Sequence, residues 1–424
     1  MEHSLVIVVL ALRNLRRQFR RTLLTSLAMI IGGGLLMFSL TLGDGTHERW
    51  IESGVRMGSG HVTIERPEFR TSRRIEDRLP EMARRATEQA LTSVGIAEQV
   101  KAVSPKLIIT GLASSAAGAR PAQIMGVEPR AEASFSTLDE QLVEGRYLDP
   151  ADRLAAYVGI GLVESLDLRL GSRLVVTAQD AHREVAGQLL RVVGVFRTGV
   201  PKIDQALIHM PLKTAGKWLG SGRDVTNVGV IVEDSADVSR LVVGLRDALA
   251  EPIQSGTTTV TSWQEAMPEL SAMVAIDDFG NYLVYGILFV IIGFGIVNTV
   301  LMSVMHRYRE FGVLQALGLT PGQTGALVLV EGLVLTVVSS TIGIGLGILL
   351  TWYCFGDGLD FSALMDEEMT FSGVVIDPVI IPLFRMARII QALAFILGVG
   401  VVASVYPAIR AMRIDVTKAM KFDR

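Results

Sequence analysis

Hydrophobic and polar residues separate along this chain into long uncharged runs and the charged segments between them. About 20 apolar residues, at a rise of 1.5 Å each, cross the ~30 Å hydrocarbon core of a bilayer. Runs of that length are Thr22–Leu42, Phe279–Met305, Gly332–Gly356 and Ile389–Ile409. The pattern therefore predicts a membrane protein with four transmembrane helices, at 22–42, 279–305, 328–356 and 389–409.

The segment 43–278, between the first two spans, has the mixed pattern of a folded domain. Alternation over His61–Glu65 predicts a strand that stops at Pro67, and Leu79–Val100 has helical periodicity. The small residues of Gly111–Arg120 predict a loose hairpin tip. Helices over 45–57 and 263–276 are expected to continue into the spans. Other strands and helices are expected at Ala102–Thr110, Ala122–Val127, Ala156–Gly159, Ile160–Leu168, Arg173–Thr177, Leu189–Phe196, Gln205–Met210, Leu212–Leu219, Val228–Val232, Ser235–Leu249 and Thr257–Val260.

These elements predict a large α+β domain made of two parts. The outer parts, about 43–125 and 222–270, each connect directly to a span, so we expect them to pair. The middle part, 126–221, is richer in strands and is interpreted as an inserted subdomain.

Charge is distributed unevenly about the spans, and this predicts their orientation. Because cytoplasmic loops carry an excess of Lys and Arg, both termini (1–21 and 410–424) and the segment 306–322 are predicted to be cytoplasmic. The domain and the loop 357–388 are then extracytoplasmic. Arg385 and Arg388 oppose this pattern but are outnumbered. The basic residues that decide it are Arg13, Arg16, Arg17, Arg20, Arg21, His306, Arg307, Arg309, Arg410, Arg413, Lys418 and Lys421.

Residues 4–20 combine an apolar stretch with the arginine cluster that follows it. We interpret them as an amphipathic helix in the inner membrane interface, with its arginines toward anionic headgroups. A disordered tail is the alternative. A cleaved signal peptide is not indicated, because there the basic cluster comes first.

Composition and motifs argue against a catalytic role for this chain. Half of its 424 residues are hydrophobic and its mean hydropathy is +0.42. The Gly216-Lys217 pair lacks the upstream glycine of a phosphate-binding loop. The six histidines form no metal-spaced pair, and the lone Cys354 lies in a predicted span. We therefore expect no cofactor or metal here, no nucleic-acid partner, and an ATPase on another chain if the protein performs uphill work.

The segment between the second and third spans has the pattern of a short helix that binds a partner. Arg309 and Glu310 are expected to face water. Phe311, Val313, Leu314 and Leu317 recur at helical spacing, and Gly318 and Pro321 end the helix. Such a helix presents apolar side chains to a groove on a soluble protein. A passive connector is the alternative.

Polar residues within the spans suggest contacts between helices. Glu331 is expected to pair with Arg307 or Arg309, and Asn298 to form a hydrogen bond to another helix. Gly32-Gly33-Gly34 and the glycines at 343, 345 and 347 would allow close helix packing.

Two long motifs resemble the ABC permeases of the lipoprotein-release, macrolide-export and FtsX-like superfamily. The first, its coupling-helix motif, is Arg309-Glu310-Phe311-Gly312-Val313-Leu314-Gln315-Ala316-Leu317-Gly318. The second is the ending, from Tyr406-Pro407-Ala408 to Lys421, in which Val416 and Met420 replace the usual Pro and Leu. Shorter matches are Ala11–Leu15, Arg21–Thr25, Gly60–Ile64, Gly126–Pro129, Glu144–Arg146 and Val192–Phe196. Gly60-His61-Val62 followed by Pro67 is most similar to the lipoprotein-release branch.

The resemblance implies one permease of a transporter in a bacterial inner membrane. Two permeases, identical or paralogous, would assemble with a cytoplasmic ABC ATPase dimer that holds ATP and Mg²⁺. The domain would have the parts called Porter (43–125 and 222–270) and Sabre (126–221). Continuous helices at 22–57 and 263–305 would relay motion to it. The ATPase-coupling residues would be Arg309, Glu310, Phe311, Gly312, Val313, Leu314, Leu317, Gly318, Arg410, Arg413 and Lys418.

The resemblance leaves the cargo open. A lipoprotein or another amphipathic cargo is favoured, with contacts at Met37, Phe38 and Tyr282 and with a periplasmic acceptor or adaptor as a further partner. One alternative is an FtsX-like regulator that transports nothing and activates a cell-wall hydrolase. Another is efflux of a small hydrophobic drug or toxin through an adaptor. The size of the domain favours a transporter over a regulator.

Overall fold

A computed structural model describes residues 19–93, 95, 97, 100–356, 358–360, 370–371, 374–375 and 379–416. They form a helical unit and an α+β unit. The chain passes from one unit to the other near residues 47, 274, 361 and 379. The predicted amphipathic helix at 4–20 lies outside the described residues, except that 19 and 20 begin the first long helix.

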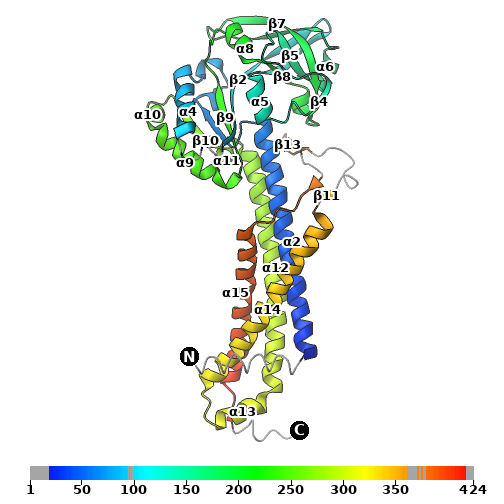
Figure 1. Cartoon of the computed structure of the whole chain (residues 1–424), viewed down its shortest axis with the longest axis vertical. Helices are drawn as coiled ribbons and strands as arrows, with labels where there is room; N and C mark the ends of the chain where they lie inside the picture. The colour runs from blue at the N-terminus through cyan, green and yellow to red at the C-terminus, as the bar shows by residue number, and fades with distance from the viewer. Residues whose placement is uncertain are drawn as a thin grey trace. The chain divides into compact units, whose positions relative to one another are not determined.

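Four long helices build the helical unit (Figure 1). They are α2 (Phe19–Met57), α12 (Pro268–His306), α14 (Pro321–Phe355) and α15 (Met386–Met412). Among the described residues these are the helices long and apolar enough to cross a membrane, as predicted. A short helix, α13 (Tyr308–Ala316), follows α12. The two-residue strands β11 (Leu359–Asp360) and β14 (Val379–Ile380) also belong to this unit, whereas β12 (Thr370–Phe371) and β13 (Val374–Val375) belong to the α+β unit.

Glycines let the long helices pack backbone to backbone. A Cβ on Gly343 would lie 2.7 Å from the carbonyl oxygen of Ile30, and one on Gly347 would lie 2.8 Å from the Cα of Gly34. Both distances are too short for a real side chain, so α2 and α14 can approach this closely only through glycine. This confirms the packing role predicted for Gly343 and Gly347, whereas a Cβ on Gly345 would have nothing within 4 Å.

The α+β unit is built on one ten-stranded sheet of mixed direction. Its order is β10-β1-β9-β2-β3-β8-β5-β7-β4, and β6 pairs with β2 and β7. The β3–β8 and β5–β7 pairs are parallel. The strands are β1 (Val62–Glu65), β2 (Val100–Ser115), β3 (Gly118–Val127), β4 (Leu142–Gly145), β5 (Ala155–Gly159), β6 (Arg173–Gln179), β7 (Val185–Phe196), β8 (Leu207–Pro211), β9 (Asn227–Val232) and β10 (Thr259–Ser262).

Short helices cover this sheet (Figure 1). Strands β5, β8 and β9 are buried along their whole length, whereas β6 alternates between buried and exposed residues because one face is open. The helices are α3 (Phe69–Ser72), η1 (Ile75–Asp77), α4 (Glu81–Ser93), α5 (Pro129–Phe135), α6 (Ile160–Ser165), α7 (Pro201–Asp204), α8 (Leu212–Trp218), η3 (Ser235–Asp237), α9 (Val238–Ala248), α10 (Ala250–Gln254) and α11 (Trp263–Ala266).

The strands from 43–125 and 222–270 are neighbours at one end of the sheet, where β10, β1, β9 and β2 lie side by side. The strands from 126–221 continue the same sheet through the β3–β8 pair. The two parts therefore share a sheet.

Three predicted elements differ from the structure. The tip at Gly111–Arg120 is not loose, because β2 and β3 pair up to Ser115 and Gly118 and β6 pairs with β2 at 112–114. The helix predicted at 79–100 is α4 and ends at Ser93. The helix predicted from 263 is broken at Met267, which has φ −127° and ψ 72°. A proline disfavours helical geometry in the residue before it, so α12 starts at Pro268.

Candidate functional site

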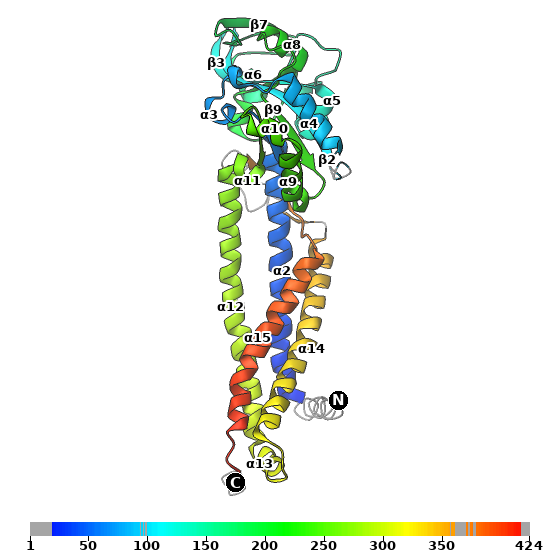
Figure 2. The ribbon, with the colours of Figure 1, turned by 90° about the vertical axis from the view of Figure 1, so that its left-hand side faces the viewer.

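The first candidate site is α13, which connects α12 to α14 at one end of the helical unit (Figure 2). Arg307, with φ −104° and ψ 16°, ends α12, and Gly318, with φ +104°, follows α13. Thr320 and Gln323 then form a capping box, and Pro321 begins α14. The segment is therefore a short helix with a defined stop at both ends.

The apolar side chains of α13 do not all face outward. Leu317 is 80% exposed, Val313 42% and Leu314 36%, and Arg309 and Glu310 are exposed as predicted. Phe311 is 1% exposed, and Gly312 is also buried. The prediction that Phe311 offers its ring to a partner was therefore wrong, because the ring packs into the core of its own chain.

Arg307 joins α13 to both neighbouring helices. Its Nε donates to Glu310 of α13 at 3.0 Å, and its Nη1 donates to Glu331 of α14 at 3.1 Å. Its guanidinium carbon lies 4.7 Å from the centre of the Phe311 ring. The Ser303 hydroxyl of α12 donates to Glu331 at 3.3 Å. The predicted partner of Glu331 is thus Arg307, whose side chain links α13 to α14, while Ser303 links α12 to the same carboxylate.

The end of α15 lies beside this segment. Arg410 and Arg413 are exposed, while Ile414 shares the buried core that contains Phe311. A Cβ on Gly325 would lie 2.6 Å from Met412, so α15 packs tightly on the start of α14. The C-terminal end of α15 thus lies at the same end of the helical unit as α13 (Figure 2), and Arg410 and Arg413 belong to that end of the helix. Lys418, predicted with them, lies outside the described residues.

The second candidate site is an apolar cleft of about 380 Å³ between α2, α12 and α15. Its lining is largely aromatic and aliphatic, so it suits acyl chains or a hydrophobic molecule. The lining residues are Leu36, Leu40, Tyr282, Tyr285, Gly286, Phe289, Gln391, Ala392 and Phe395.

Of the three predicted cargo residues, one lines this cleft and two do not. Tyr282 lines it and is 68% exposed. Met37 is 0% exposed, so its prediction as a contact was wrong: at its position on α2 the side chain faces the interior of the bundle. Phe38 is half-buried, with its ring 5.5 Å from that of Phe355 on α14. Periodicity places both residues on α2 but does not reveal which helix covers each face.

Polar residues follow the cleft toward the end of α2. Arg388 of α15 binds Asp44 of α2 through its Nε, 3.0 Å from both carboxylate oxygens. The Nε2 of His47 lies 2.6 Å from Asp277 of α12. Arg388, which opposed the charge pattern in the sequence, is therefore neutralised by Asp44.

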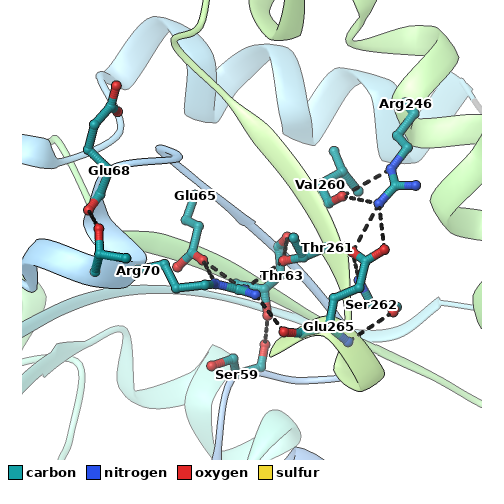
Figure 3. A network of polar contacts seen from close by, with 11 residues as sticks. Ser59, Thr63, Glu65, Glu68, Arg70, Arg246, Val260, Thr261, Ser262 and Glu265 are labelled. Carbon is teal, nitrogen blue, oxygen red and sulfur yellow. Dashed lines mark hydrogen bonds and ion pairs between the residues drawn. The ribbon is translucent and has the colours of Figure 1, made fainter. Parts of the chain in front are cut away.

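A third cluster anchors the start of α12 in the α+β unit (Figure 3). Arg70 donates to Glu65 of β1 at 2.8 Å, to the Thr261 hydroxyl of β10 at 2.9 Å and to the carbonyl oxygen of Glu265 at 2.8 Å. Arg246 of α9 donates to the Glu265 carboxylate at 3.0 Å. The turn that precedes α12 is thereby tied to both strands and to α9.

The end of α2 is anchored next to it. Ile51 and Val55 belong to the core of the α+β unit, and β1, which follows α2, pairs with β10 so that Val62 lies opposite Ser262. The helices that precede and follow the domain, α2 and α12, are therefore attached to the adjacent strands β1 and β10. Sequence reasoning missed both anchoring clusters, because their members are distant in the chain.

Comparison with known proteins assigns the family. Residues 22–248 match the MacB-like periplasmic core domain, and residues 282–416 match the FtsX-like permease C-terminal region. The chain belongs to the family of permeases that combine these two domains. It is accordingly a membrane protein and an ABC transporter permease component, with the α+β unit as its extracytoplasmic domain. Permeases of this family are generally non-catalytic.

Individual relatives are distant. The lipoprotein-releasing system transmembrane protein LolC of Neisseria meningitidis is 21% identical over 76% of this chain and 79% of its own. The macrolide export ATP-binding/permease protein MacB 1/2 of Paracoccus denitrificans is 26% identical over 97% of this chain, which spans 58% of that longer protein. The solved extracellular domain of the transporter YknZ is 16% identical, with a TM-score of 0.34, over 47% of this chain and 99% of that domain.

Proposed function

We propose that this chain couples ATP hydrolysis by a separate cytoplasmic ATPase, which holds ATP and Mg²⁺, to movements of its extracytoplasmic domain. The movements extract or export a lipoprotein or another amphipathic cargo. A second permease, identical or paralogous, completes the transporter. In this proposal α13 and both termini are cytoplasmic.

The observation that carries the proposal is that α13 has an exposed apolar face and a second face that is fixed to its own chain. Val313, Leu314 and Leu317 are exposed and available to a groove on a soluble partner. Arg307 and the buried Phe311 fix the same helix to α12 and α14. A force applied to the exposed face is therefore passed to two transmembrane helices. A passive connector needs no such attachment.

The apolar cleft supports an amphipathic cargo. It lies between transmembrane helices, and its polar end is continuous with the ion pairs at Asp44 and His47. A regulator that moves no cargo has no need of this cleft, so the structure favours transport over the regulatory alternative. An adaptor or acceptor on the extracytoplasmic side remains part of the proposal.

The test combines labelling with purification. In a Cys354→Ala background, Leu317→Cys should react with a membrane-impermeant maleimide in inverted vesicles and not in right-side-out vesicles. Purification from native membranes in mild detergent should recover an ATP-hydrolysing chain and a lipidated protein. Labelling from the outside, or full activity without an ATPase, would refute the proposal. Recovery of a peptidoglycan hydrolase in place of cargo would favour the regulator.

A further inference from the structure

The apolar cleft ends in a small polar pocket that the cargo prediction did not anticipate. The pocket has a volume of about 30 Å³ and shares Leu40, Tyr282, Tyr285 and Gln391 with the cleft, so the two adjoin. Its other lining residues are Gly43, Asp44, His47, Asp278, Asn281 and Arg388. A molecule with its chains in the cleft would place its polar end here.

Among the described residues that line this pocket, one guanidinium, that of Arg388, is present, and it is already bound by protein groups. It holds both oxygens of Asp44, and its Nη1 donates to Gln391 at 3.1 Å. The Asp44 side chain is 5% exposed and the Arg388 side chain 34%, so the carboxylate is shielded from water while part of the Arg388 side chain is accessible. An anionic ligand would have to compete with Asp44 for the Arg388 guanidinium, which disfavours an anionic group in this pocket.

Apart from the Asp44–Arg388 pair, the charged groups in and beside the pocket are mainly acidic. The Asp278 side chain is 50% exposed, with one oxygen 3.8 Å from the Nδ1 of His47. His47 also bonds Asp277, so one imidazole faces two carboxylates. Asn281 donates its amide to Asp277 at 3.3 Å, which leaves its carbonyl oxygen as an acceptor. Whether His47 is neutral or protonated, Asp277 and Asp278 give this end a negative balance.

The size of the pocket also restricts which headgroups can bind there. The pocket is small, at about 30 Å³, so a compact group fits it better than a bulky one. A tetrahedral phosphate or a trimethylammonium is larger, and the latter offers no hydrogen-bond donor. A primary ammonium is compact and has three donors to share among a carboxylate, an amide oxygen and water.

We propose that this pocket binds the primary ammonium group of an acyl-chain amphiphile whose chains occupy the adjoining cleft. The inference rests on the proposed function in that it uses the same cleft, but it concerns the headgroup. The ammonium could belong to an aminophospholipid or to the free amine of a lipidated peptide.

The test measures which lipid stays bound to the full-length protein. The protein is placed in nanodiscs of phosphatidylethanolamine, phosphatidylcholine and phosphatidylglycerol with identical acyl chains, and retained lipid is counted by native mass spectrometry. With identical acyl chains, phosphatidylcholine differs from phosphatidylethanolamine only in the three methyl groups that replace the hydrogens on its nitrogen. We expect it to be retained roughly threefold to tenfold more than either competitor, the range for one partly exposed charged hydrogen bond.

Matched variants assign the preference to the pocket. Asp278→Asn should abolish it, while Glu269→Gln, which removes the same charge from an exposed position of α12 outside the pocket, should preserve it. A lipopeptide with a free amine, compared with its acetylated form, shows whether a peptide amine is accepted too. Equal retention of the three lipids, or an unchanged preference in Asp278→Asn, would overturn the inference. Neither result depends on the ATPase, so the proposed function would stand or fall separately.

Discussion

Lys106 and Glu132 form an ion pair at 3.0 Å inside the extracytoplasmic domain, and each side chain is only 1% exposed. The Ser104 hydroxyl donates to the second Glu132 oxygen at 2.6 Å, and the Lys106 ammonium lies 3.9 Å from the centre of the Phe135 ring. The same ammonium is 3.5 Å from the carbonyl oxygen of Gly58, just beyond α2. A positive charge is favourable at a helix C-terminus, so the pair also stabilises the end of the first long helix.

Breaking this pair from one side should destabilise the domain strongly. Lys106→Met leaves the Glu132 carboxylate buried without its counter-ion, which costs about 3–5 kcal/mol. Hydrogen exchange of domain peptides in the full-length protein should show the loss. The double variant Lys106→Met/Glu132→Leu removes both charges, and its stability should be closer to that of the wild type than the stability of Lys106→Met alone. If the double variant is the less stable of the two, the desolvation argument is incorrect.

Acid should destabilise the domain through His209. Its side chain is fully buried on β8, and desolvation lowers its pKa from 6.5 to about 4. The unfolded chain binds a proton below about pH 6.5 while the folded domain does not. The contribution of neutral His209 to the free energy of unfolding is therefore fully present above that pH. It is lost as the pH falls toward 4, by on the order of 3 kcal/mol.

His209→Phe tests this assignment by removing the titrating group. Burial also lowers the pKa of His61 to about 4, so the variant should retain part of the acid sensitivity. Hydrogen exchange at pH 7 and pH 5 gives the comparison. An equal loss of protection in wild type and His209→Phe would contradict the role of His209.

Leu317 should govern binding of the ATPase without affecting folding. Because it is 80% exposed, Leu317→Glu places a charge on the face of α13 proposed to contact the partner, and should reduce co-purified ATPase about tenfold or more. The thermal stability of the permease should not change. Val243→Glu, at an exposed apolar position of α9, is the matched control. ATPase recovery equal to wild type from Leu317→Glu would remove the main support for the coupling role.

Phe311 should behave in the opposite way, since it lies in the core. Phe311→Ala is expected to cost about 3–5 kcal/mol through the cavity that it leaves. Gly312→Trp would likewise insert a large ring at a buried position, so neither variant isolates partner binding. A permease of unchanged stability that has lost its ATPase would show that Phe311 contacts the partner directly.

Arg307 should be required for transmission through α13 more than for docking. Arg307→Lys keeps the charge but cannot reach Glu310 and Glu331 with a fixed planar fork. We expect ATPase recovery close to wild type and cargo release per ATP reduced several-fold, because one exposed face still binds while its link to α14 is weakened. Arg309→Lys, on the exposed side of α13, serves as the control. Equal loss in both variants would indicate a general charge effect.

Local patterns were sufficient for the architecture of this protein. A run of apolar residues long enough to cross a bilayer is visible without tertiary information, and so is the stop made by Gly318 and Pro321 after α13. Alternation predicted β1, and the motif Arg309–Gly318 led to the correct family. These features depend on neighbours within a few turns, and this is why the amino-acid sequence alone determined them.

Tertiary structure decided which face of each element is covered. Helical spacing puts Phe311 and Leu314 on one face of α13, and Met37 and Phe38 follow one another on α2. Only packing against other helices buries Phe311 and Met37 and leaves Leu317 exposed. Asp44 and Arg388 are 344 positions apart, and their ion pair, like the cleft and polar pocket around it, exists only because α2 and α15 meet. Burial and charge pairing depend on such distant contacts, which no local pattern encodes.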